Sequence, residues 1–171
     1  FYEPPSASVA GSDITQCNNS TFTMAATPVT AGIGTWSVQS GFAVTITNVN
    51  SATTTVTGLP AGSSSTLLWT VSNGNCTDNT STLTITNDVQ PVADAGTGGD
   101  VCGKDAVNPF TFTGVASTGS GLWTNQTPLV GAASFTDNTS ATTDVSVDTY
   151  GTYVFRWTET NGTCSDFDDI T

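Results

Sequence analysis

Apolar and polar side chains alternate with a period of two residues over most of the chain. In the stretch TLLWTVS, Leu67, Trp69 and Val71 fall on one face, and in YVFRWTE Phe155 and Trp157 do the same. This is the period of a β-strand with one buried face, whereas an amphipathic helix repeats its apolar positions every three or four residues. The sequence therefore predicts an all-β protein.

Strands are expected in two series, each interrupted by Gly, Pro and Asn. A short strand opens each series, one before Cys17 and the other before Cys102. The remaining strands are expected over 20–25, 34–39, 42–48, 53–58, 66–72 and 80–87, and over 109–114, 121–126, 132–136, 142–147, 152–159 and from 165 onward. About seven short strands in each series predict two sandwiches of antiparallel sheets.

The two series are copies of one unit, because the same phrases recur in the same order. The matches are WTVSNGNC at 69–76 with WTETNGTC at 157–164, GIGTW at 32–36 with GSGLW at 119–123, and SATT at 51–54 with SATT at 140–143. Matched positions lie 85 to 89 residues apart, so the chain is a tandem duplication whose loops differ slightly in length. We expect one repeat over 6–90 and a second over 91–171.

The repeated phrases also predict turns. Asn-Gly readily adopts positive φ, so Asn73-Gly74 and Asn161-Gly162 are expected to join the last two strands of each copy. The Gly-x-Gly segments of GIGTW and GSGLW open no helix, so they predict turns at strand entries and not phosphate-binding loops.

Four cysteines occupy matched places in the two copies. Because the copies are duplicates, we expect one disulfide per domain, joining Cys17 to Cys76 and Cys102 to Cys164. The alternative of a four-cysteine zinc site is disfavoured because no C-x2-C spacing occurs. Such disulfides predict an oxidising, extracellular setting.

The four tryptophans could belong to the cores or to a sugar-stacking platform. Trp36, Trp69, Trp123 and Trp157 all lie on expected strands at repeated positions, which favours core aromatic residues.

The phrase DTYGTY resembles the tyrosine corner of immunoglobulin-like domains, with Tyr153 as its tyrosine. The first copy has Ser65 at the aligned position, so we expect this brace in the second copy alone.

Acidic side chains dominate the charge. Fourteen Asp and Glu oppose two basic residues, Lys104 and Arg156, and histidine is absent, giving a formal net charge of −12. This balance opposes binding to nucleic acid or anionic lipid, and no apolar run reaches the ~20 residues of a membrane span. Without histidine the commonest general base is missing, although paired carboxylates for glycoside hydrolysis remain a catalytic alternative. We expect no enzyme activity, no nucleic-acid partner and no membrane insertion.

Several carboxylates lie near the junction of the copies. Asp88, Asp94, Asp100 and Asp105 could supply converging oxygens for calcium, of which Asp88, Asp94 and Asp100 are the candidate ligands. Their spacing is not that of an EF-hand, and ordinary solubilising charge is the alternative. No other cofactor is expected.

The motifs SVAGSDITQC, GTWS and LLWTVSNGNC resemble the immunoglobulin-like or PKD-like repeats of giant surface adhesins of gliding Bacteroidota. The resemblance covers nearly all of the chain, although the second copy reads AGTGGDVC where the first motif is expected. It implies two tandem immunoglobulin-like sandwiches in an exported protein of the type IX secretion system, held at the outer membrane or secreted as a filament. Asp13 and Cys17 fit the first motif, and Asp100 is displaced from it.

The resemblance favours a stalk segment that serves surface adhesion and gliding motility. Its partners would be neighbouring repeats, together with surface glycans or the secretion and motility machinery. The alternative is an accessory carbohydrate-binding or spacer module of a secreted multidomain enzyme. Many further copies in the parent reading frame would favour the adhesin, and a neighbouring hydrolase domain would favour the module.

The alignment of the copies also gives an expectation for the two ends. Phe1 aligns with Thr86, so residues 1–5 are expected to end the last strand of an upstream repeat. A constant offset of 88 places Thr171 on Leu83, so the last strand of the second copy is expected to be incomplete. We expect a less stable second sandwich, or one that borrows a strand from a neighbouring chain.

Overall fold

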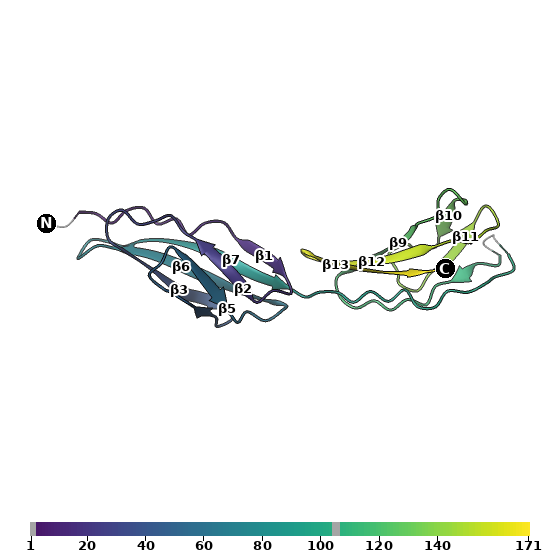
Figure 1. The fold of residues 1–171 in the computed structure, drawn as a ribbon, viewed down its shortest axis with the longest axis horizontal. Coiled ribbons are helices and arrows are strands. Elements are labelled where there is room, and N and C mark those ends of the chain that lie inside the picture. Colours follow the sequence, from purple (N-terminus) through teal and green to yellow (C-terminus); the bar gives the residue numbers. More distant parts are fainter. Residues whose placement is uncertain (1–2, 104–106) are drawn as a thin grey trace. The chain divides into compact units, whose positions relative to one another are not determined.

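The protein forms two all-β units in tandem, as the sequence predicted. The computed structural model describes residues 3–103 and 107–171, and its compact units are Phe1–Val89 and Gln90–Thr171. Each described unit is an immunoglobulin-like sandwich of two sheets (Figure 1), which confirms the predicted fold class. The described residues include no helix with the length and hydropathy needed to cross a membrane.

The first unit has seven strands. One sheet has the order β1-β7-β6-β3 and the other the order β2-β5-β4. The strands are β1 (Ile14–Cys17), β2 (Thr21–Ala25), β3 (Ile33–Gly41), β4 (Thr45–Ile46), β5 (Thr53–Thr57), β6 (Ser63–Ser72) and β7 (Asn79–Asp88). All pairs are antiparallel except β1 with β7, which run parallel.

The second unit has six strands among its described residues. Its sheets have the orders β13-β12-β9 and β10-β11-β8. The strands are β8 (Phe110–Thr111), β9 (Ser120–Asn125), β10 (Ala133–Phe135), β11 (Asp144–Val147), β12 (Phe155–Asn161) and β13 (Cys164–Ile170). The short strand expected before Cys102 is not formed, so this unit has no counterpart of β1 among the described residues.

Burial follows the alternation of the sequence. Along β6 every second side chain is buried, including Leu67, Trp69 and Val71, and along β12 the inward positions include Phe155 and Trp157. Each unit has its own core, gathered around a cross-strand pair of tryptophans. The ring centroids of these pairs are 4.9 Å apart in the first unit and 5.3 Å apart in the second.

The Gly-x-Gly-x-Trp motif supplies the space for these pairs. Its first glycine makes the turn into the strand with positive φ, +102° at Gly32 and +84° at Gly119. Its second glycine lies under the tryptophan of the neighbouring strand. A Cβ at Gly34 would come within 2.1 Å of the Trp69 ring, and one at Gly121 within 1.9 Å of the Trp157 ring. A larger residue there would displace the buried indole.

Both Asn-Gly pairs lie at the expected hairpins, but the second hairpin is tighter. In the second unit the last pair before the turn is Asn161 with Cys164, so two residues connect the strands. In the first unit the last pair is Val71 with Asn79, so the connection is longer. The constant offset of 88 between the copies, which placed Thr171 on Leu83, is therefore wrong by one residue in this strand. Ile170, and not Thr171, takes the place of Leu83.

The first residues of the chain lie beside the β6–β7 connection of the first unit. Glu3 is outside any strand, and its carbonyl accepts a hydrogen bond from Asn73 Nδ2 at 2.8 Å. Residues 1–2, which belong to the predicted end of an upstream strand, lie outside the described residues.

Candidate functional site

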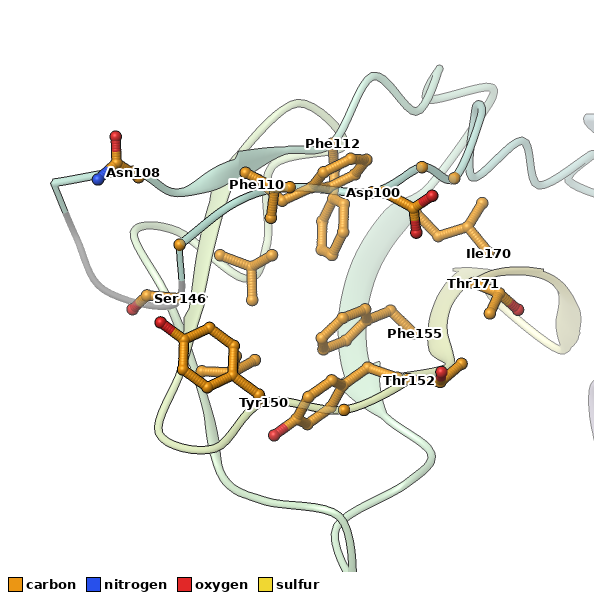
Figure 2. Close-up of a pocket in the computed structure, with 18 residues that line it drawn as sticks. Asp100, Asn108, Phe110, Phe112, Ser146, Tyr150, Thr152, Phe155, Ile170 and Thr171 are labelled. Atoms are coloured by element: carbon orange, nitrogen blue, oxygen red, sulfur yellow. The ribbon is translucent and has the colours of Figure 1, made fainter.

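The second unit contains a cavity of about 510 Å³ between its two sheets. Figure 2 shows Asp100 and Thr171 on one side of the cavity and Tyr150 on the other. Its lining comes from residues 98–103, from β8, β11 and β12, from the 150–153 turn, and from the end of β13.

Aromatic and aliphatic side chains form the floor of this cavity. Phe112 is fully buried, and its ring centroid lies 5.1 Å from that of Phe155. Tyr153 stacks on Phe155 at 5.8 Å, and Val145 completes the apolar wall. The floor is therefore a continuation of the core, and it suits an apolar side chain better than a charged group.

The rim of the cavity is polar but carries little charge. It includes Asn108, Ser146 and Thr152, and Asp100 supplies the one side-chain carboxylate among the described lining residues. Tyr150 stands at the rim with 73% of its surface exposed. Most glycoside hydrolases use a pair of carboxylates, and the described lining of this cavity supplies one, Asp100.

Tyr153 fixes one wall through the predicted tyrosine corner. Its hydroxyl donates a hydrogen bond to the Thr149 carbonyl at 2.8 Å, and the residue is 8% exposed. In the first unit the aligned Ser65 donates instead to the Ser40 carbonyl at 3.4 Å. The brace holds the 149–153 turn against the cavity.

Glu159 is a buried carboxylate that the sequence analysis did not single out. It is 1% exposed, and its Oε1 accepts hydrogen bonds from Trp157 Nε1 at 3.1 Å and from the Ser117 amide at 2.8 Å. The Ser117 hydroxyl donates to Oε2. The signal for this burial was present, since Glu159 follows Trp157 by two residues and aligns with the buried Val71.

The predicted disulfides are wrong. Cys76 and Cys102 are free thiols, whereas Cys17 and Cys164 are disulfide-bonded. Neither the Cys17 to Cys76 bond nor the Cys102 to Cys164 bond is therefore formed.

Strand length explains why the predicted partners do not meet. Cys17 lies opposite Asp88, the last residue of β7, while Cys76 precedes Asn79, the first residue of that strand. A strand of ten residues spans roughly 30 Å, and a disulfide requires Cα atoms within about 7 Å. Matched positions in a duplicated sequence thus do not imply proximity within each copy.

The second unit separates its cysteines in the same way. Cys164 is the first residue of β13. Cys102 follows Val101, which lines the cavity together with Thr171, and Thr171 lies at the opposite end of β13 from Cys164.

All four tryptophans lie inside the two cores. Trp36, Trp69, Trp123 and Trp157 are each 1% exposed, so their faces are not available for stacking on a sugar.

The calcium candidates are not gathered into a ligand cluster. In the described parts of the chain no group of three or more His, Cys, Asp or Glu is placed to hold a metal ion. Asp94 Oδ1 accepts a hydrogen bond from the Gly96 amide at 2.9 Å, Asp100 lines the cavity, and Asp88 ends β7. Asp105 lies outside the described residues.

Solved structures resemble the whole chain in fold. The N-terminal eight Ig domains of the Down syndrome cell adhesion molecule match 98% of this chain at 10% identity with a TM-score of 0.53. Extracellular domains 3–5 of Drosophila OTK match 99% at 10% identity, also with a TM-score of 0.53. The insect immune protein hemolin matches 97% at 13% identity with a TM-score of 0.47.

This chain spans 46% of the hemolin chain, 27% of the adhesion-molecule chain and 61% of the OTK chain. No protein-family model matches the sequence, and no curated protein matches it. The chain is thus a tandem of immunoglobulin-like domains, similar in fold to those of adhesion molecules.

Proposed function

We propose that this chain is a non-catalytic stalk segment of a large, repetitive bacterial surface adhesin. The observation that carries the proposal is the duplication of one immunoglobulin-like unit with its core motif intact. Gly34 and Gly121 lie under Trp69 and Trp157 in the same way. A repeated core of this kind maintains a structural module, and repeats of one module can be joined into a long filament.

The solved structures support the extracellular part of the proposal. One of them contains Ig domains of a protein named as a cell adhesion molecule, and another consists of domains described as extracellular. Disulfide-bonded Cys17 and Cys164 agree with an oxidising setting. We place the segment at the cell surface or in a secreted filament, with neighbouring repeats as its principal partners.

The finer assignment rests on the sequence motifs. GTWS and LLWTVSNGNC favour the adhesins of gliding Bacteroidota, exported by the type IX secretion system. In that setting the stalk would present a distant binding region to a surface and transmit force during gliding.

A replacement experiment in the parent adhesin tests the stalk role. Residues 6–171 would be exchanged for an unrelated tandem pair of immunoglobulin-like domains of the same length, and adhesion and gliding of the cells would be measured. Deletion of the same residues serves as the matched control. Because a stalk acts through its length, the replacement is expected to retain adhesion.

Loss of adhesion on replacement, with export and surface display unchanged, would contradict the stalk role. Binding of the isolated chain to a polysaccharide panel would instead support the accessory module.

A further inference from the structure

Each unit carries one disulfide-bonded cysteine and one free cysteine. In the first unit Cys17 is bonded and Cys76 is free, and in the second unit Cys164 is bonded and Cys102 is free. Because the other cysteine of the same unit is a free thiol, neither bonded cysteine has its partner within its own unit. The repeat thus forms its disulfides outside its own sandwich.

The cysteines are of two kinds, which the duplication defines. Cys17 and the aligned Cys102 are the early cysteines of their copies, and Cys76 and the aligned Cys164 are the hairpin cysteines, which follow the Asn-Gly turn. One early and one hairpin cysteine are oxidised. The two remaining thiols are also one early and one hairpin cysteine, so they form a complementary set.

The two kinds lie at opposite ends of the first unit. The early Cys17 lies opposite Asp88, where β7 ends, and Figure 1 shows β1 beside β7. The hairpin Cys76 lies in the connection that precedes Asn79, the first residue of β7. The length of this strand therefore separates the two positions.

The second unit has the same arrangement. The hairpin Cys164 is the first residue of β13. The backbone that leads to the early Cys102 passes the other end of this strand, where Gly98 lies against the Thr171 carbonyl. Each unit therefore presents an early cysteine at one end and a hairpin cysteine at the other.

Both free thiols are more accessible than their bonded counterparts. Cys102 is exposed whereas Cys17 is half-buried, and Cys76 is half-buried whereas Cys164 is 2% exposed. The Cys76 thiol donates a long hydrogen bond of 3.6 Å to the Glu3 carbonyl. Neither free thiol belongs to a hydrophobic core, so an oxidant and a second protein can reach both.

We propose that Cys76 and Cys102 are the two halves of a disulfide between copies of this chain, with Cys76 of one copy bonded to Cys102 of another. The occupant of each free cysteine is thus a second copy, and the two copies meet end to end. A contact between unlike positions is heterologous, so it can continue from copy to copy as a filament. The inference rests on the proposed stalk function in taking another repeat as the partner, and it adds a covalent bond between repeats.

The bond forms by thiol–disulfide exchange with a small disulfide, such as oxidised glutathione, as the oxidant. The Cys76 thiolate attacks one sulfur of this disulfide, which gives a mixed disulfide and releases one glutathione thiolate. The Cys102 thiolate of the second copy then attacks Cys76 Sγ, forms the new S–S bond and releases the second glutathione. Two cysteine thiols are oxidised, one glutathione disulfide is reduced, and the two thiol protons end on the released glutathione.

Pairing of like cysteines is the alternative. A bond from Cys76 to Cys76, or from Cys102 to Cys102, would give a two-fold dimer that cannot extend. The oxidised cysteines favour unlike pairing, because they are one early and one hairpin cysteine.

The test uses two single variants of the purified chain. Cys102→Ser leaves the Cys76 thiol, and Cys76→Ser leaves the Cys102 thiol. One variant is isotopically labelled, and each is incubated with a glutathione redox buffer, alone and as an equal mixture. Non-reducing gels separate the products, and mass spectrometry maps their disulfides. The double Cys76→Ser and Cys102→Ser variant is the control, alanine variants form a second set, and melting temperatures check the fold of all of them.

The mixture should give a dimer linked from Cys76 to Cys102. This dimer should exceed either dimer of like cysteines at least about tenfold, a ratio that a docking preference of ~1.4 kcal/mol provides. The unmodified chain should form a ladder of longer products, and the double variant should stay monomeric.

A statistical mixture of like and unlike dimers would overturn the proposal. So would dimers of like cysteines alone, a bond from Cys76 to Cys102 within one chain, or thiols that glutathione modifies but that never join two chains. Each of these results leaves the replacement experiment in cells unaffected, so the covalent bond can fail while the stalk role stands.

Discussion

Trp69 and Trp157 hold the same place in the two units, but they bury their indole nitrogens differently. In the first unit Trp69 Nε1 and Trp36 Nε1 are buried without a hydrogen-bond partner among the described residues. In the second unit Trp157 Nε1 donates to Glu159, and Trp123 Nε1 donates to the Ser140 carbonyl at 3.1 Å. The same scaffold is thus completed in one copy by apolar packing and in the other by a buried polar network.

For Trp69 and Trp157, the residue two positions further along the strand decides this difference. Val71 is fully buried beside Trp69, where the second unit has Glu159. An unsatisfied buried donor costs about 1–3 kcal/mol, so the first unit offsets that cost by packing alone. The second unit satisfies its donor but must bury a carboxylate, which is tolerated only with several hydrogen bonds. A duplicated core can therefore diverge in polarity while its glycines and tryptophans stay fixed.

The largest expected effects come from removing the inner tryptophans. Trp69→Ala and Trp157→Ala should each lower the free energy of unfolding of their unit by about 3–5 kcal/mol, because each empties a well-packed site. Trp157→Ala should cost more, since it also removes a donor from Glu159. Denaturant unfolding of the whole chain, followed by hydrogen exchange in each unit, measures both. A smaller loss for Trp157→Ala than for Trp69→Ala would contradict the stabilising role of the hydrogen bond between Trp157 and Glu159.

Replacing Glu159 should have the next largest effect. Glu159→Val copies the first unit, but it leaves the Ser117 amide and Trp157 Nε1 without their acceptor, so the second unit should lose about 1–3 kcal/mol. Glu159→Gln retains a carbonyl oxygen and should cost less. Thermal melts of both variants give the order. A more stable Glu159→Val protein would show that burial of the carboxylate outweighs its hydrogen bonds.

Period-two alternation was sufficient to predict the fold because it reports directly which side chains face a core. The alternation located β6 and β12. Continued from Trp157 to the next inward position, it would also have located the buried Glu159. The repeated phrases likewise marked the hairpins at Asn73 and Asn161. These features are local, so the sequence within a few residues determines them.

The cysteine pairing and the cavity could not be obtained in this way. Cys17 and Cys76 lie near opposite ends of β7. The distance between them depends on strand pairing over the whole sheet. The cavity is lined by residues 98–103, the 150–153 turn and the end of β13, which lie far apart in the sequence and meet only through strand pairing. Both are properties of register between distant segments.

Tyr153→Phe should produce a moderate effect confined to the second unit. The change removes the hydrogen bond to the Thr149 carbonyl and leaves the ring in place, so the second unit should lose about 1 kcal/mol. Ser65→Ala is the matched control, and it should change the first unit less because its hydrogen bond is long. The two melting temperatures test this. Equal shifts would mean that the tyrosine corner contributes no more than the serine.

The smallest effect concerns an ion pair that the first unit lacks. Arg156 donates two hydrogen bonds of 2.8 Å to Asp169, at a cross-strand position that Leu68 and Thr82 occupy in the first unit. The hydrogen bond from Arg156 lowers the pKa of the Asp169 carboxyl below its ordinary value of 3.8. Both side chains are partly exposed, at 31% and 35%, so solvent screens the pair.

The sign of the pH dependence follows from that lowered pKa. A carboxyl whose pKa is lower in the folded state adds stability above its unfolded pKa and loses it as the pH falls through the folded value. Arg156→Gln should therefore reduce the stability of the second unit slightly at neutral pH, and the difference from the parent chain should shrink as the pH falls below about 4. Arg156 also lies 3.6 Å from the Phe167 ring centroid, but loss of that contact does not depend on the ionisation of Asp169. Stability measured from neutral to acidic pH separates the two contributions, and a difference that stays constant with pH would assign the effect to the ring contact.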